Sequence, residues 1–121
     1  MKKWMKHLSN RIGDDAEVLA ISYLQQQGLK LVDRNYHCRR GEIDIIMEDA
    51  GTLIFIEVKY RQSDQFGSAA EMVTPQKQQK IITTALHYLQ QHKLDRACRF
   101  DVVTITPKNG MQWIKGAFEA N

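Results

Sequence analysis

The chain has 121 residues, which is enough for one domain with one hydrophobic core. Its hydrophobic fraction of 43% and charged fraction of 26% are those of an ordinary soluble globular protein. No apolar run approaches the roughly 20 residues that span a bilayer, and the N-terminus lacks the apolar region of a secretory signal. We therefore expect a cytoplasmic protein that does not enter a membrane.

The net charge of +3 is modest, but it is unevenly distributed. Residues 1–12 contain four basic and no acidic residues, so we expect a basic N-terminal segment followed by a single domain at 13–121. Such a local excess suits a polyanion, although charged runs are more often solvated surface. Further basic residues gather in the middle of the chain: Arg34, Arg39, Arg40, Lys59 and Arg61.

Neither the cysteines nor the histidines have the spacing of metal ligands. Cys38 and Cys98 are too few for a disulfide framework and do not form a CxxC pair. We expect both thiols to be reduced and mostly buried. The four histidines form no HxxxH or HExxH pattern, so a zinc site is not expected.

The first predicted helix spans residues 13–28, where apolar residues recur at a spacing of three to four. Gly28 stands where a glycine commonly ends a helix. The residues 29–37 then predict a strand, and residues 39–41 predict a turn. The apolar stripe of the helix consists of Ala16, Leu19, Ala20, Tyr23 and Leu24.

Two segments rich in Ile, Val and Phe follow, Glu42–Glu48 and Thr52–Arg61. The sequence Asp-Ala-Gly between them predicts an antiparallel hairpin. Residues 62–74 are polar and predict a loop, which is either a flap that grips a substrate or a plain connection.

A second helix is predicted from Pro75, with Thr74 as its N-cap and Ile81, Ile82, Ala85 and Leu89 as its buried stripe. Residues 99–106 predict another strand. Asn109-Gly110 is a type I′ turn signal before a short strand at 112–115.

The predicted order of elements is α-β-β-β-α-β-β. A helix between the third and fourth strands makes those two strands parallel. The sequence therefore predicts an α/β fold in which helices flank a mixed sheet.

The hairpin supports a geometric inference about four charged residues. If its turn is centred on residues 50–51, Asp44 faces Glu57 and Glu42 faces Lys59, and direct partners share a face of the sheet. The side chains predicted to continue that face under a helix are Ile46, Leu53 and Phe55. The opposite face is predicted to carry Ile43, Ile45, Ile54, Ile56 and Val58.

Two carboxylates beside a core repel each other, and each costs several kcal/mol unless it is paired or bound to an ion. A Mg²⁺ ion would remove this repulsion, and Lys59 would orient a water or stabilise charge on a phosphate. This combination is the apparatus of phosphodiester hydrolysis. Alternatively, Glu42 and Lys59 form a cross-strand salt bridge while Asp44 and Glu57 merely edge the sheet.

The pattern of Asp44 followed by Glu57-Val58-Lys59 resembles the D…(D/E)xK signature of the restriction-endonuclease-like superfamily, PD-(D/E)xK. A wider set of residues resembles the YraN-like family of small predicted endonucleases, which are similar to archaeal Holliday-junction resolvases. The similarity extends over roughly residues 11–118. The matching residues are Gly13, Glu17, Arg34-Asn35, Gly41–Asp44, Phe55–Arg61, Gly67, Val73, Lys77 and Arg99–Val103.

The resemblance implies a fold of the restriction-endonuclease-like type and a set of site residues. Asp44 and Glu57 would bind Mg²⁺ or Mn²⁺, the Val58 carbonyl would add a ligand, and Lys59 would assist the attacking water. Glu17 matches the first-helix glutamate of resolvase-like relatives and would be a further metal ligand, although a lone helix glutamate is usually at the surface.

Several basic residues are candidates for contact with a nucleic acid. Arg39 and Arg40 flank the strand that enters the site, and we expect them to contact the backbone of the nucleic acid. Lys77 and Lys80, in the first turns of the second helix, are either phosphate contacts or solvated lysines. Arg61 completes this set. By contrast, Asp101 is expected to pair with a nearby arginine.

We therefore expect a metal-dependent endonuclease that acts on DNA, with branched or junction DNA as a candidate substrate. A homodimer would supply one site for each strand. Two alternatives are a nucleic-acid-binding module without turnover and a protein-interaction adaptor. The paired carboxylates argue against both, because they would repel an anionic ligand unless a cation intervened.

Overall fold

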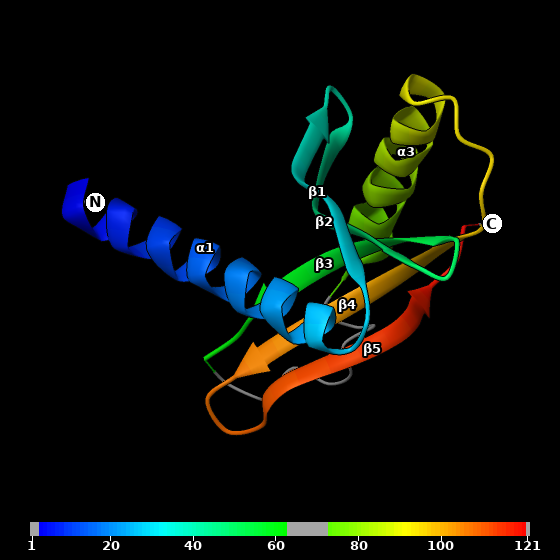
Figure 1. Cartoon of the computed structure of the whole chain (residues 1–121). Helices are drawn as coiled ribbons and strands as arrows, with labels where there is room; N and C mark the ends of the chain where they lie inside the picture. Colours follow the sequence, from blue (N-terminus) through cyan, green and yellow to red (C-terminus); the bar gives the residue numbers. More distant parts are fainter. Residues whose placement is uncertain (1–2, 63–72, 121) are drawn as a thin grey trace.

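The structure, a computed structural model, describes residues 3–62 and 73–120, and its described side chains begin at residue 15. Five strands form one sheet in the order β1-β2-β3-β4-β5 (Figure 1). The strands are β1 (Lys30–Cys38), β2 (Gly41–Asp49), β3 (Thr52–Tyr60), β4 (Cys98–Thr106) and β5 (Gly110–Phe118), and the helices are α1 (Lys3–Gln26) and α3 (Pro75–Gln91). The predicted α/β class and the order α-β-β-β-α-β-β are confirmed.

The sheet is mixed. Strands β3 and β4, which α3 connects, are parallel, and every other neighbouring pair is antiparallel. Strand β3 is therefore central, with an antiparallel neighbour on one side and a parallel neighbour on the other. The predicted loop at 62–74 lies largely outside the described residues, so its interpretation as a flap stays a prediction. Neither helix, over the part that is described, has an apolar stretch long enough to cross a bilayer.

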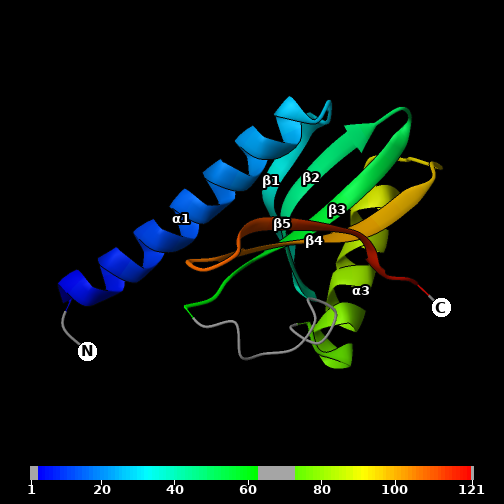
Figure 2. The same cartoon turned by 90° about the horizontal axis from the view of Figure 1, so that it is seen from below.

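Each face of the sheet carries its own hydrophobic core, with α3 on one face and α1 on the other (Figure 2). On the α3 side, Ile81, Ile82 and Ala85 pack on Ile43, Ile46, Leu53, Phe55, Val73, Phe100, Val102 and Phe118. On the α1 side, Ala20, Ile21 and Leu24 pack on Leu29, Ile45, Met47, Ile54, Ile56 and Val103. The middle of β3 is therefore buried on both faces, and an ionised side chain there must be compensated.

The predicted helix ends are confirmed at both caps. Thr74 caps α3, because its Oγ1 accepts a hydrogen bond from the Lys77 amide at 3.1 Å. Gly28 has a φ of 99°, and the amides of Gly28 and Leu29 donate to the last turn of α1, as in a Schellman motif.

The helix α1 differs from its prediction in two respects. It begins at Lys3, well before residue 13, because lysine, methionine and leucine, which recur in residues 3–12, have a high helix propensity. Leu19, which was predicted to be buried, is 56% exposed. The buried stripe passes instead through Ala16, Ala20 and Leu24.

Of the two predicted type I′ turns, the one between β2 and β3 is confirmed and the one between β4 and β5 is not. Ala50 and Gly51 both have a positive φ, as a type I′ turn requires, and this sets the predicted register of β2 on β3. The predicted type I′ turn at Asn109-Gly110 was wrong. Thr106 pairs with Gly110, so residues 107–109 form a three-residue loop, and Gly110 but not Asn109 has a positive φ.

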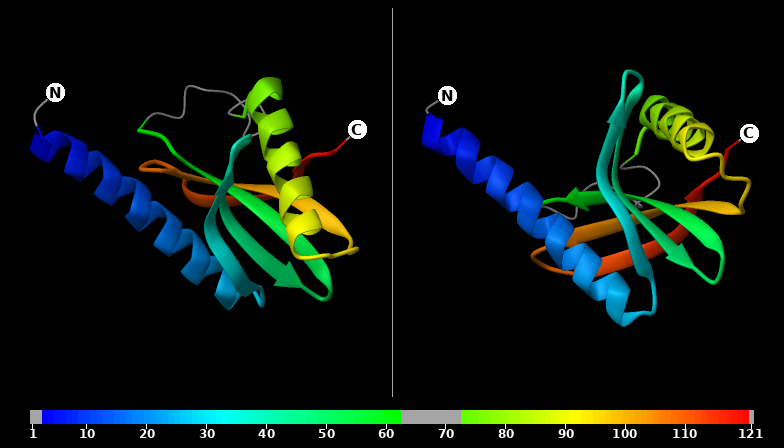
Figure 3. Two further views of the ribbon diagram at one scale, coloured as in Figure 1. Left: turned by 90° about the horizontal axis from the view of Figure 1, so that it is seen from above. Right: turned by 45° about the horizontal axis from the view of Figure 1, so that its top comes forward.

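The β1–β2 hairpin leaves the plane of the sheet and lies beside α3 (Figure 3). Gly41 permits this approach, since a Cβ atom there would lie 3.0 Å from Thr84 Oγ1 and 3.5 Å from Lys80 Cβ. Thr84 is fully buried, and its hydroxyl donates to the Lys80 carbonyl at 2.8 Å. The hairpin therefore rests on a hydroxyl that has little freedom to move.

We predict that Gly41→Ala lowers the free energy of unfolding by about 1 kcal/mol, because the added methyl overpacks this contact. In a Thr84→Ala background the same substitution should cost less, since the opposing hydroxyl is gone. Urea denaturation of the four proteins measures this coupling as a double-mutant cycle. Equal losses in both backgrounds would contradict the proposed contact.

Candidate functional site

The ladder between β2 and β3 ends just before two acidic residues. Ile45 pairs with Ile56, as the hairpin register predicted, and no rung follows that pair. The Val58 amide instead donates to Asp44 Oδ2 at 2.9 Å. A side chain thus replaces a backbone partner, and β2 separates from β3 at Asp44 and Val58. We call this point of separation the fork. The predicted direct pairing of Asp44 with Glu57 is therefore not part of the ladder.

Beyond this point β2 pairs with β1 alone. Two-stranded ribbons twist more strongly than strands inside a wide sheet. Ile43 accordingly lies in the core on the α3 side, whereas the predicted alternation placed it with Ile45 on the α1 side. That prediction was wrong because strict alternation assumes a strand that stays in the plane of the sheet.

Asp44 and Glu57 nevertheless share one electrostatic environment. Glu57 is 6% exposed, and burial followed by the negative charge of Asp44 raises the pKa of Glu57 to about 7. Burial also raises the pKa of Asp44, while the Val58 hydrogen bond acts in the opposite direction. Asp44 is therefore close enough to disfavour ionisation of Glu57, which fits the predicted repulsion between the two carboxylates.

Two lysines compensate the buried carboxylate. Lys59 Nζ lies 3.5 Å and Lys77 Nζ lies 3.7 Å from the same oxygen, Glu57 Oε1. The structure thus brings together Asp44, Glu57 and Lys59, as predicted from the sequence. Among the described side chains Lys59 pairs with Glu57 and not with Glu42, so the alternative Glu42–Lys59 salt bridge is not formed.

Sequence reasoning placed Lys77 among the phosphate contacts and missed its approach to Glu57. A signal for this contact was present at the start of α3. The Thr74 cap and Pro75 place Lys77 in the first turn of the helix that follows β3 in the chain and covers the face carrying Glu57.

Glu17 pairs with Arg34, and its role as a further metal ligand stays a prediction. Glu17 Oε1 lies 3.3 Å from Arg34 Nη2, and Glu17 is not among the charges that shift the pKa of Asp44 or Glu57. Over the side chains of residues 15–62 and 73–120, no three histidine, cysteine, aspartate or glutamate residues converge as metal ligands. The carboxylates at the site are therefore those of Asp44 and Glu57, with Glu42 nearby.

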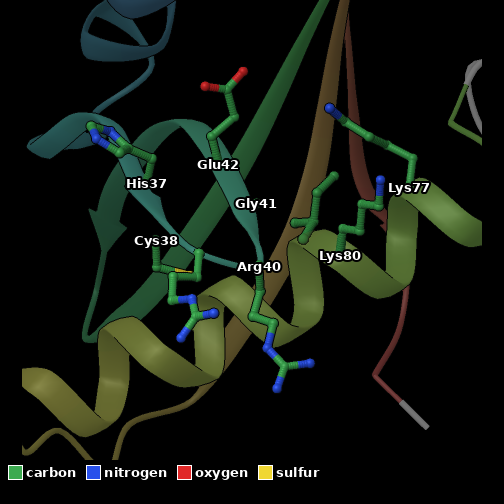
Figure 4. A pocket seen from close by; sticks show the side chains of 9 residues that line it. His37, Cys38, Arg40, Gly41, Glu42, Lys77 and Lys80 are labelled. Atoms are coloured by element: carbon green, nitrogen blue, oxygen red, sulfur yellow. The ribbon is translucent and has the colours of Figure 1, made fainter.

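Four of the five predicted nucleic-acid contacts meet in one cavity of about 450 Å³ (Figure 4). It lies between the tip of the β1–β2 hairpin and the first turns of α3. Arg61, the fifth, is not part of this lining, and its amide donates to the Ile105 carbonyl at 2.9 Å. The residues that line the cavity are His37, Cys38, Arg39, Arg40, Gly41, Glu42, Lys77, Lys80 and Ile81.

Asp101 has the structural role that was predicted for it. Arg99 donates to both of its carboxylate oxygens at 2.8 Å. The Trp113 indole and the Gly116 amide each add a hydrogen bond at 2.9 Å, which sequence reasoning had not identified. This fully buried carboxylate ties β4 to β5 and is satisfied without an ion.

Both cysteines are free thiols, as expected. Cys98 is exposed and Cys38 is half-buried, so the prediction that they are mostly buried was wrong. Cys98 begins β4, where the end of the strand leaves its side chain accessible.

The fold and the site define a small α/β domain that carries a pair of acidic side chains and two lysines at the fork between two strands. The chain belongs to the uncharacterised protein family UPF0102, which matches residues 16–105.

Members of this family resemble the chain over nearly its whole length. It is 51% identical over 111 residues to a UPF0102 protein of Nitrosococcus oceani, with 88% of this chain and 90% of the relative covered. It is 49% identical over 117 residues to a UPF0102 protein of Coxiella burnetii, with 95% and 98% covered. The crystal structure of SSO0001 is similar with a TM-score of 0.45 and 20% identity, over 92% of this chain and 54% of that one. A similarity this distant does not bear on function.

We predict that the metal-free protein loses stability as pH rises from about 4.5 to about 7. Glu57 has an ordinary pKa of 4.5 and a pKa of about 7 in the fold, so folding favours its protonated form. The stabilisation is complete below the ordinary pKa and disappears as pH rises through the folded one. It amounts to no more than roughly 3 kcal/mol.

Urea denaturation in chelator between pH 4 and pH 8 measures this effect. Glu57→Gln should flatten the profile over that window. Glu48→Gln is the matched control, because Glu48 is a more exposed carboxylate that pairs with Arg96. A Glu57→Gln profile parallel to that of the wild type would show that Glu57 does not titrate as described.

Proposed function

We propose that this protein is a Mg²⁺-dependent endonuclease that hydrolyses phosphodiester bonds in DNA, with branched DNA as its substrate. We further propose that it is a YraN-like member of the restriction-endonuclease-like, PD-(D/E)xK, superfamily. The observation that carries the proposal is the partly buried pair of Asp44 and Glu57 with Lys59 beside it. Such a pair is costly to a fold unless a cation compensates it.

The donor atoms at the fork suit a hard divalent cation. At the start of β3 the Leu53 amide donates to the Ala97 carbonyl just before β4, and just after β3 the Arg61 amide donates to Ile105 of β4. Odd-numbered residues of β3 therefore direct their amides towards β4. Val58 therefore faces β2, and its carbonyl lies on the same edge of the strand as its amide. Two carboxylates and this carbonyl are oxygen ligands of the kind that Mg²⁺ or Mn²⁺ prefers. Glu17, which pairs with Arg34 in this structure, would be a further ligand, and Mg²⁺ commonly keeps several waters as its other ligands.

The chain's own residues would divide the chemistry between them. A bound cation would supply Lewis acidity and an activated water. Asp44 and Glu57 would hold it, and the Val58 amide would keep Asp44 in place. Lys59, whose ammonium already lies at the carboxylate, would orient the attacking water or stabilise charge that develops on the phosphate.

Two alternatives on the same fold are a DNA-binding module without turnover and a protein-interaction adaptor. Neither requires two acidic side chains at a partly buried site next to a basic cavity, where they would repel a phosphate. We place the nuclease in the cytoplasm, and a homodimer would present one site to each strand.

We predict that calorimetric titration of Mn²⁺ detects one ion per chain, and that Asp44→Asn or Glu57→Gln weakens its binding at least tenfold. The same variants should lower Mg²⁺-dependent cleavage of branched DNA by roughly a hundredfold or more. Lys59→Ala should keep the metal affinity and lose cleavage, because it acts on the water and the phosphate.

Glu48→Gln, which removes a carboxylate at the other end of β2, is the control and should behave as the wild type in both assays. A Glu57→Gln protein that cleaves DNA at the wild-type rate would refute the proposed mechanism.

A further inference from the structure

The cavity between the hairpin tip and α3 is strongly basic. Arg39, Arg40, Lys77 and Lys80 line it against one carboxylate, that of Glu42. Figure 4 shows Lys77 and Lys80 rising from α3, with Glu42 on the strand across from them. A second hollow of about 320 Å³ adjoins it and shares Arg40 and Lys80, and its other lining residues, Gln76, Gln79 and Thr83, are polar. Arg40 and Lys80 thus line both hollows.

Lys77 pairs with Glu57, but the other three cations of the cavity take part in no such pair among the described side chains. Three other arginines of the chain form ion pairs: Arg34 with Glu17 of α1, Arg96 with Glu48 of β2, and Arg99 with Asp101 of its own strand, β4. By contrast, Arg39, Arg40 and Lys80 form no ion pair with any side chain that the structure describes. Their charge is therefore available to a ligand.

The hairpin that carries the arginines is held firmly against α3. Gly41 rests on Thr84, and the Tyr36 ring meets the Tyr88 ring edge to face at a centroid distance of 5.1 Å. The Tyr36 hydroxyl also hydrogen-bonds His87 Nδ1. These contacts fix the backbone of the hairpin, so little freedom is lost when the cavity accepts a ligand.

The cavity opens next to the carboxylate pair. Lys77 lines it and also lies 3.7 Å from Glu57 Oε1. Glu42 lines it as well, and its negative charge contributes to the raised pKa of Asp44. A chain of regularly spaced phosphates with one group at Asp44 and Glu57 would therefore bring a neighbouring group to Arg40 and Lys80.

We propose that this cavity binds the DNA backbone at a phosphate next to the one that is hydrolysed, with Arg40 and Lys80 as its cationic partners. The inference rests on the proposed function for the identity of the neighbouring site. Contacts of this kind position the DNA and do not identify bases. Binding through the cavity is therefore independent of sequence and depends strongly on salt.

The test compares two double variants in a Glu57→Gln background, which removes one repelling carboxylate and prevents cleavage. Arg40→Gln/Lys80→Gln removes the cavity cations. Lys30→Gln/Lys93→Gln removes the same charge from exposed positions outside both hollows. Fluorescence anisotropy of a labelled DNA duplex of mixed sequence, in chelator at several salt concentrations, gives the binding constant and its salt dependence.

The cavity variant should lose at least tenfold in affinity, and the slope of log K against log salt should fall by about two. The control should keep the parent's slope. Equal losses in both variants, or no DNA binding by the parent, would overturn the inference. Cleavage by the wild-type chain in Mg²⁺ is assayed separately. Absence of cleavage together with the expected change in slope would refute the proposed function and support the cavity as a DNA-binding site.

Discussion

The hydrogen bond from the Val58 amide to Asp44 Oδ2 determines where β2 and β3 separate. The two strands are joined by backbone pairing as far as Ile45 and Ile56. Beyond that pair, the Asp44 carboxylate accepts the hydrogen bond of the Val58 amide in place of a backbone carbonyl. The carboxylate satisfies the Val58 amide, so the fork does not carry the cost of leaving that amide unpaired. This hydrogen bond also holds the carboxylate of Asp44 against the central strand, next to Glu57.

The rest of the site follows from this separation. Once β2 is free of β3, the β1–β2 ribbon twists out of the sheet and meets α3 through Gly41. Because the ribbon twists in this way, Arg39 and Arg40 lie near the lysines of α3, and together these residues line the basic cavity. The carboxylate pair and the cavity are therefore two consequences of one fork, and this explains why they adjoin.

The two lysines at the fork match the two carboxylates in number, but they do not restore the ordinary pKa of Glu57. Two ammonium groups share one oxygen of Glu57, at 3.5 Å and 3.7 Å, and the pKa of Glu57 remains raised to about 7. The lysines thus offset only part of the cost of burial and of the charge on Asp44. A divalent cation would compensate both carboxylates at once and release the lysines to interact with a phosphate. Under the proposed function, the two lysines would pair with Glu57 only until the cation and the phosphate bind.

Local chemistry explains how much of this arrangement could be predicted from the sequence. The register of the hairpin follows from Ala50-Gly51, because a type I′ turn permits one pairing of its flanking strands, and the Thr74–Pro75 cap likewise places the start of α3. The position of Ile43 and the separation of Asp44 from the ladder could not be predicted. They depend on strand twist and on a bond between a side chain and the backbone.

Contacts between elements that are far apart in the sequence also could not be predicted from the pattern of residues. Glu17 lies on a helix whose packing angle decides its neighbours, and it meets Arg34. Lys77 meets Glu57 because α3 covers that face of the sheet.

The central claim is that Asp44, Glu57 and the Val58 carbonyl share one divalent cation. Anomalous diffraction from crystals soaked in Mn²⁺ tests it most directly. The account predicts one anomalous peak in each chain, within coordinating distance of both carboxylates and of the Val58 carbonyl, with Lys77 moved away from Glu57. The claim would be contradicted if the crystals showed no anomalous peak at the fork while Mn²⁺ was bound elsewhere. It would also be contradicted if there were no peak and Lys59 and Lys77 still contacted Glu57.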